Sequence, residues 1–140
     1  MKLRLLLAGV TVAGLVYACS TNPFTGQQSL NFVSNDQLFP SAFQQYDQFL
    51  KENKVITGTP DAQKVTSVGM KIKAAAEKWL NANGQAGYLN GYQWEYKLVD
   101  DKAVNAWCMP GGKIVVYTGI LPITKDEAGL ATVMGHEVSH

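Results

Sequence analysis

The sequence has 140 residues, of which 46% are hydrophobic and 16% are charged, and its formal net charge is +1. This length and composition fit one globular domain with a single core, and they exclude a largely disordered chain. A nucleic-acid-binding surface needs a basic patch or stripe, which this charge balance does not provide, so nucleic acid is excluded as a partner.

The first 18 residues have the pattern of an export signal. Lys2 and Arg4 precede an apolar run of about a dozen residues, which is too short to cross a bilayer comfortably. The segment Val16-Tyr17-Ala18-Cys19 resembles a bacterial lipobox, although Tyr17 fits it imperfectly, and this resemblance implies lipidation of Cys19. The residue directly after this cysteine is Ser20 rather than Asp, which is similar to lipoproteins sorted to the outer membrane. The expected location is therefore the periplasmic face of that membrane, held by a lipid anchor.

Two alternatives remain open for the cysteines and the signal. The signal can direct plain secretion to the periplasm without lipidation. Cys19 and Cys108 can form a disulfide in an oxidising compartment. We do not expect Cys108 to be a catalytic thiol, because the two histidines of the chain belong to another motif.

Residues 19–37 are rich in small polar residues and predict a tether with a short strand at 30–33. Apolar residues at helical spacing then predict a helix over 38–53. Thr59 and Pro60 are typical of a second helix start, with Thr59 as the N-cap and Pro60 in the first helical position. We expect this helix to end near Asn81 and its lysines to form a solvated face.

A small β-sheet is predicted next. Residues 92–99 alternate between aromatic or apolar and polar side chains, which predicts a strand with one buried face. The apolar runs 103–109 and 113–118 are joined by Pro110-Gly111-Gly112, and this pattern predicts a β-hairpin. Neither glycine has a Cβ, so the turn can take positive φ without strain.

The last helix has a predicted start of its own. Thr124-Lys125-Asp126-Glu127 is a capping-box pattern, in which the Thr124 hydroxyl accepts a hydrogen bond from the Glu127 amide. We therefore predict a helix that begins at Lys125. Gly129 and Gly135 are expected to permit close packing of this helix.

That helix carries the motif His-Glu-x-x-His at residues 136–140. Helical residues four apart lie on one face with Cβ atoms about 5 to 6 Å apart, so His136 and His140 can bind one Zn²⁺ as metal ligands. Glu137 lies one step round the helix, where its carboxylate can act as the catalytic general base. The alternative is a chance pair of histidines on a solvated helix face.

The stretch from Asn105 to Leu121, followed by this helix, is similar to the CAAX prenyl protease type of zinc metallopeptidase. The similarity is to its bacterial periplasmic lipoprotein branch, whose opening also resembles residues 22–34. The resemblance implies an α+β, zincin-like (gluzincin) fold with N-terminal helices, a small β-sheet with a hairpin, and the HExxH helix. It also implies a zinc-dependent metalloendopeptidase in envelope protein quality control.

The resemblance further implies how a protein or peptide substrate binds. One of the hairpin strands would offer its edge to an extended peptide, and Asn105, Ala106 and Trp107 are the candidate residues. It also implies Zn²⁺ ligands at His136 and His140. The competing hypothesis is a non-catalytic periplasmic lipoprotein that acts as a chaperone or scaffold.

The site implied by the resemblance has one ligand more than the motif supplies. A catalytic zinc site normally has three protein ligands, and family members supply a glutamate from a helix beyond the motif. We therefore expect residues 38–140 to be the N-terminal part of a longer peptidase domain, truncated at the motif, and the 140 residues alone to be inactive. Asp100 and Asp101 are the nearest upstream carboxylates that can replace the glutamate.

Overall fold

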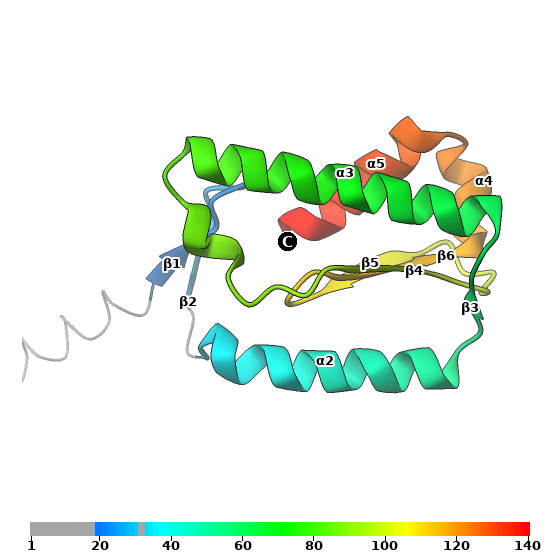
Figure 1. Ribbon diagram of the computed structural model, residues 1–140, viewed down its shortest axis with the longest axis horizontal. Helices are drawn as coiled ribbons and strands as arrows, with labels where there is room; N and C mark the ends of the chain where they lie inside the picture. Colours follow the sequence, from blue (N-terminus) through cyan, green and yellow to red (C-terminus); the bar gives the residue numbers. More distant parts are fainter. Residues whose placement is uncertain (1–18, 31–32) are drawn as a thin grey trace, which may run out of the picture. The chain divides into compact units, whose positions relative to one another are not determined.

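The structure, a computed structural model, describes residues 19–30 and 33–140 (Figure 1). The predicted export signal at 1–18 lies outside these residues, as does the middle of the strand predicted at 30–33. The chain divides into two compact parts, one up to Ser34 and one from Asn35 onward, and each is described by itself. None of the helices in the described ranges is long and apolar enough to cross a membrane.

The first part contains a β-hairpin, in which β1 (Cys19–Thr21) pairs antiparallel with β2 (Gln28–Leu30). The side-chain oxygen of Asn22 accepts hydrogen bonds from the amides of Phe24 and Thr25 and so stabilises the turn. The described residues of the predicted tether therefore form a two-stranded hairpin, whose second strand includes Leu30, the first residue of the predicted strand. Its polar residues serve the turn, which composition alone did not reveal.

The second part begins with two long helices. α2 (Asn35–Glu52) and α3 (Pro60–Ala82) are separated by the short strand β3 (Val55–Ile56). The Thr59 side chain accepts a hydrogen bond from the Ala62 amide, and Pro60 occupies the first turn. Both predicted helices and the predicted N-cap are confirmed. α2 begins three residues earlier than predicted, and the C-terminal ends of both helices differ from the prediction by one residue.

A four-stranded sheet with the order β3-β4-β6-β5 follows a 3₁₀ turn, η1 (Ala86–Leu89). β4 (Glu95–Val99) is parallel to β6 (Lys113–Tyr117), whereas β5 (Ala106–Met109) forms an antiparallel hairpin with β6. The predicted hairpin is confirmed, and Gly111 and Gly112 in its turn have φ values of 86° and 83°. β4 and β5 both start three residues later than predicted.

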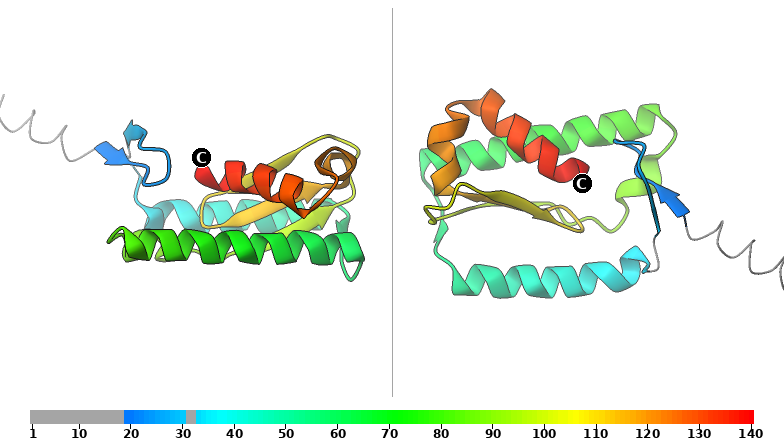
Figure 2. Two further views of the ribbon diagram at one scale, coloured as in Figure 1. Left: turned by 90° about the horizontal axis from the view of Figure 1, so that it is seen from above. Right: turned by 180° about the vertical axis from the view of Figure 1, so that it is seen from behind.

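Helices cover both faces of this sheet. α2 lies on one face, and α3 with α5 (Glu127–Ser139) lies on the other (Figures 1 and 2). The larger core joins Leu98, Ile114 and Val116 to residues of α3 and α5, and a smaller core joins Val99 and Val115 to Tyr46 of α2. The predicted buried face of β4 is confirmed by Trp94, Tyr96 and Leu98 in the larger core, whereas the opposite face is also covered, since Val99 packs with α2.

The start of α5 differs from the predicted capping box. The chain after β6 forms a 3₁₀ turn, η2 (Thr118–Ile120), and a single-turn helix, α4 (Leu121–Thr124). The Thr124 hydroxyl donates to the carbonyl of Leu121, and the N-cap of α5 is Asp126, whose carboxylate accepts from the Gly129 amide. Pro122 favours an early helical turn, which already includes Thr124, so the next capping residue starts α5.

The two glycines of α5 have different surroundings. A Cβ atom at Gly129 would lie 2.1 Å from the carbonyl oxygen of Thr124, whereas a Cβ at Gly135 would meet nothing within 4 Å. The predicted close packing is confirmed at Gly129, where the turn from α4 passes beside the helix. It is wrong at Gly135.

Candidate active site and metal centre

The last turns of α5 bring the two histidines of the motif together. The Nε2 atoms of His136 and His140 are 2.9 Å apart, and their ring centroids are 4.4 Å apart. Two nitrogens that bind one tetrahedral Zn²⁺ at 2.0–2.1 Å lie about 3.3 Å apart, which is close to this separation. Both imidazoles are exposed to solvent. The pair therefore fits a shared metal ion as two of its ligands.

Packing on the sheet side of α5 sets the direction of this pair. Val138 packs against the larger core, and the Ser139 hydroxyl donates to the carbonyl of Gly135 within the helix. Residues 136 and 140 consequently lie together on the exposed side. Glu137 is half-buried beside them, and its negative charge contributes to the raised pKa of Cys108 on β5. The candidate base therefore lies near the edge strand of the sheet.

β5 is the last strand of the sheet, and it packs against α5. The Tyr117 amide donates to the carbonyl of Asn105, so the backbone groups of Asn105 and Trp107 point toward β6. Because these directions alternate along a strand, Ala106 and Cys108 direct their N–H and C=O groups to the outer edge. No described strand pairs with that edge.

The three candidate edge residues therefore have different positions. Ala106 supplies backbone groups to the open edge, and its side chain is buried in the larger core. The Trp107 side chain lies on the α2 face, where its indole N–H donates to the Tyr117 hydroxyl. Asn105 is exposed and precedes the strand. Only Ala106 of the three has an edge-facing backbone, and Cys108 is the edge residue that sequence reasoning missed.

Cys108 is a free cysteine that is partly buried. Burial and then the charge of Glu137 raise the pKa of its thiol to about 12, so the thiol stays protonated at neutral pH. Cys108 forms no disulfide within the part of the chain from Asn35 onward, and the alternative pairing with Cys19 stays a prediction. The expectation that Cys108 is not a catalytic thiol agrees with its raised pKa.

The described residues contain no cluster of three His, Cys, Asp or Glu side chains able to hold a metal ion. Asp100 forms an ion pair with Lys54 at 2.9 Å, and the Asp101 carboxylate accepts from the Ala103 amide. Both aspartates are engaged at the end of β4, so neither replaces the glutamate that the resemblance implies. The described residues thus bring together the two histidines of the motif and no third candidate ligand.

An ion pair between helices holds the start of α5. The Nζ atom of Lys71 on α3 lies 2.7 Å from a carboxylate oxygen of Glu127 in the first turn of α5. Sequence reasoning placed Lys71 on a solvated face and Glu127 in a capping box. It missed the pair because 56 residues separate the partners and no local pattern links them.

The chain is similar in sequence to known peptidases. Residues 66–140 match the model of Peptidase family M48. The mitochondrial metalloendopeptidase OMA1 of Arabidopsis thaliana is 45% identical over 69 residues, which cover 49% of this chain and 14% of that protein. The metalloprotease LoiP of Escherichia coli is 30% identical over 145 residues, which cover all of this chain and 53% of LoiP. The metalloprotease YcaL of the same organism is 32% identical over 60% of this chain and 30% of YcaL.

The chain thus spans about half of LoiP and smaller shares of the other two relatives. The family match covers α3 from Thr66, the sheet strands β4 to β6, and the whole of α5 with its motif. Since this match includes more than half of the residues, the chain belongs to peptidase family M48.

Proposed function

We propose that this chain is part of a zinc-dependent metalloendopeptidase that cleaves proteins or peptides. The observation that carries the proposal is the 2.9 Å separation of the His136 and His140 Nε2 atoms on the exposed end of α5. Membership of peptidase family M48 supports the same activity. The proposed arrangement, a small sheet whose edge strand lies beside the motif helix, is zincin-like.

Each residue of the motif has a proposed role. His136 and His140 would hold Zn²⁺ as two of its ligands. When bound, zinc acts as a Lewis acid toward water and the scissile carbonyl. The Glu137 carboxylate takes a proton from the attacking water and delivers it to the leaving amine. The partly buried position of Glu137 beside β5 supports a proton transfer near the edge strand.

The edge of β5 is the proposed substrate platform. Ala106 and Cys108 direct N–H and C=O groups outward, and an extended peptide can pair with them as an added strand. Such pairing uses the substrate backbone, so it accepts many sequences and suits a protease with diverse protein substrates. The third ligand, a glutamate by resemblance, would come from a part of the domain that follows the motif.

We also propose a cellular location for the protein and the branch of the peptidase family to which it belongs. The basic and apolar pattern of residues 1–18 and the lipobox-like Val16 to Cys19 support a lipid anchor on Cys19, at the periplasmic face of the bacterial outer membrane. A role in envelope protein quality control and the prenyl-protease-like lipoprotein branch belong to this proposal. Labelling with an alkyne fatty acid tests the anchor, and Cys19→Ser should remove the label. Persistent labelling of that variant would contradict it.

A chimera tests the peptidase directly. Residues 1–140 replace the aligned 53% of LoiP, and the rest of LoiP is retained. We expect chelator-sensitive cleavage of casein, and its loss in Glu137→Gln with zinc content unchanged, because that variant removes only the base. The intact LoiP protein is the control. A folded, zinc-loaded chimera that does not cleave casein, or a Glu137→Gln variant with full activity, would overturn the proposal.

A further inference from the structure

The second edge of the sheet is only partly filled. β3 pairs with Val99 and Leu98 of β4 and then the chain turns away at Gly58, whose φ is +73°. The next residue of β4 on that side, Tyr96, has no strand beside it in the described part of the chain. The edge of β4 is thus open immediately beyond the end of β3.

The backbone directions along β4 show what this opening offers. The Glu95 amide donates to the carbonyl of Gly112, which directs Glu95 toward β6. The Asp100 amide donates to the carbonyl of Lys54, which directs the even-numbered residues toward β3. Because the directions alternate, the N–H and C=O of Tyr96 point into the open position. An added strand can accept and donate hydrogen bonds there.

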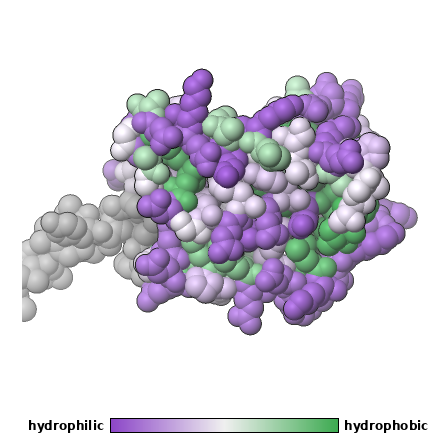
Figure 3. All heavy atoms as spheres, in the orientation of Figure 1, coloured by the Kyte–Doolittle hydropathy of each residue, from purple (hydrophilic) through white to green (hydrophobic). Residues whose placement is uncertain are grey.

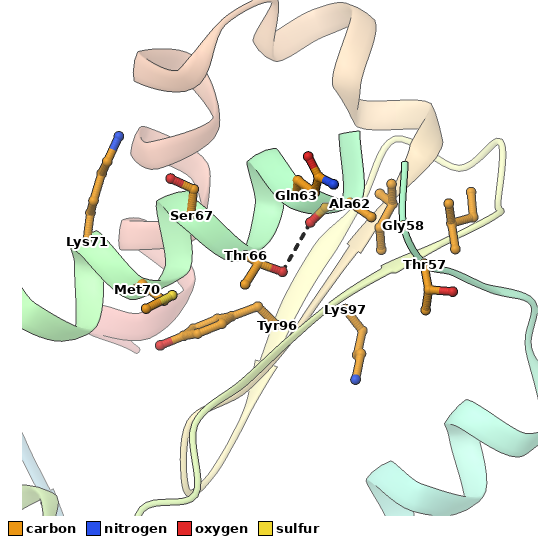
Figure 4. A pocket seen from close by; sticks show the side chains of 12 residues that line it. Thr57, Gly58, Ala62, Gln63, Thr66, Ser67, Met70, Lys71, Tyr96 and Lys97 are labelled. Carbon is orange, nitrogen blue, oxygen red and sulfur yellow. Dashed lines mark hydrogen bonds between the residues drawn. The ribbon is translucent and has the colours of Figure 1, made fainter. Parts of the chain in front are cut away.

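A groove of about 560 Å³ lies beside this open edge, between α3 and the end of β3 (Figure 4). This volume is within the range of about 300–1,000 Å³ that is usual for ligand sites. Ile56, Ala62 and Leu98 form apolar walls, and Met70 of α3 lies over the ring of Tyr96. Met70 is 60% exposed, so its apolar side chain is accessible to an occupant of the groove. In Figure 3 hydrophobic residues are visible between α3 and α2 on the β3 side.

The charged side chains that line the groove are all positive. The lining includes Lys71 and Lys97 and contains no carboxylate. Lys71 is already paired with Glu127, whereas the described residues provide no ion-pair partner for Lys97. An occupant with an acidic group therefore complements this groove better than a basic one.

We propose that this groove binds an extended segment of a partner polypeptide that contains alternating apolar and acidic residues. The segment adds to β4 as a strand beside Tyr96, continues the line of β3, places an apolar side chain against Met70, and brings a carboxylate toward Lys97. Backbone pairing and an apolar pocket together are the features of recognition by strand addition. The groove borders β3 and β4, at the opposite edge of the sheet from β5, so occupancy leaves the proposed substrate platform free.

A titration of the ¹⁵N-labelled chain with the peptide acetyl-Val-Asp-Val-Asp-Val-amide tests the proposal. We expect saturable shifts at the Tyr96 amide and at the groove residues of α3. A peptide with Lys in place of Asp should bind at least about threefold more weakly, as is usual for the loss of one exposed ion pair. N-methylation of the central valine should abolish binding, because its N–H faces β4, whereas N-methylation of the aspartates should not.

Two variants of α3 complete the test. Thr66→Trp fills the groove from an exposed position and should block the peptide, whereas Ala74→Trp, on the same helix outside the groove, should not. Equal effects of the two N-methylation patterns, shifts centred on β5, or no saturation at millimolar peptide would overturn the proposal. Concentration-dependent association of the chain through the groove would overturn it too, since the occupant would then be a second copy.

Discussion

Two polar clusters on opposite sides of the same sheet differ in burial and in partners. The Lys113 side chain, on the α2 side, is 3% exposed, and its Nζ atom lies 2.8 Å from Glu95. The same atom lies over the ring of Phe43 at 4.7 Å and over the ring of Tyr46 at 5.5 Å. The histidines of α5 are exposed, and their Nε2 atoms face each other at 2.9 Å.

This difference in burial and partners indicates that the cluster around Lys113 is structural, whereas the histidine pair of α5 is a candidate functional site. A buried charge is tolerated only when paired, and Lys113 has an ion pair and two aromatic faces within the fold. Removing it should therefore affect stability. The imidazoles of His136 and His140 are solvated and leave nitrogen atoms directed at one point, so removing them should affect ion binding and leave stability nearly unchanged.

The largest effect is expected for Lys113→Ala. Loss of the cation leaves Glu95 beside a gap under α2. We expect the free energy of unfolding to fall by about 2–4 kcal/mol. This loss is smaller than for a fully buried pair, because Glu95 is partly exposed. Urea unfolding followed by circular dichroism measures this change. His136→Ala is the matched control and should change stability by less than about 0.5 kcal/mol. Equal effects of the two substitutions would remove the distinction between the clusters.

A pair of glycine substitutions on α5 should change stability in opposite directions. Gly129→Ala forces a Cβ against the carbonyl of Thr124 and should destabilise the chain by about 1–3 kcal/mol. Gly135→Ala meets open space and should stabilise it by about 0.5–1 kcal/mol, because alanine favours the helix. Thermal unfolding of both variants measures the shifts. A stabilised Gly129→Ala variant would show that α4 does not pack beside the helix.

The N-cap of α5 gives the smallest expected difference. Asp126→Ala removes the acceptor for the Gly129 amide and should cost about 1 kcal/mol. Thr124→Ala removes only a hydroxyl that donates to Leu121 and should cost about 0.5 kcal/mol. Unfolding by urea compares the two. A larger loss of stability for Thr124→Ala than for Asp126→Ala would support the capping box predicted from the sequence.

Local patterns predicted the elements whose signals are local. Thr59 with Pro60 marked the start of α3, and the turn glycines marked the hairpin, because caps and turns depend on a few adjacent residues. The competing caps Thr124 and Asp126 lie two residues apart, and the tertiary position of α4 decided between them. The histidine spacing likewise placed both imidazoles on one helix face before any fold was known.

Features that depend on distant partners were not predictable in this way. The burial of Lys113 requires Glu95 on β4 and two rings of α2, and nothing next to Lys113 in the sequence indicates them. The parallel pairing of β4 with β6 also depends on residues that are distant in the sequence, and so does the burial of the second sheet face under α2. The edge strand beside the motif helix was expected from a family resemblance, and the residue spacing alone did not indicate it.

The most direct test of the account is a zinc titration of the chain by isothermal calorimetry, with His136→Ala, His140→Ala and Glu137→Gln as variants. We predict one Zn²⁺ per chain, bound weakly because two ligands hold it, with affinity reduced roughly tenfold or more in either histidine variant. Glu137→Gln should bind within about twofold of the parent, since Glu137 is not a ligand. Binding that is unchanged in both histidine variants would contradict the central claim.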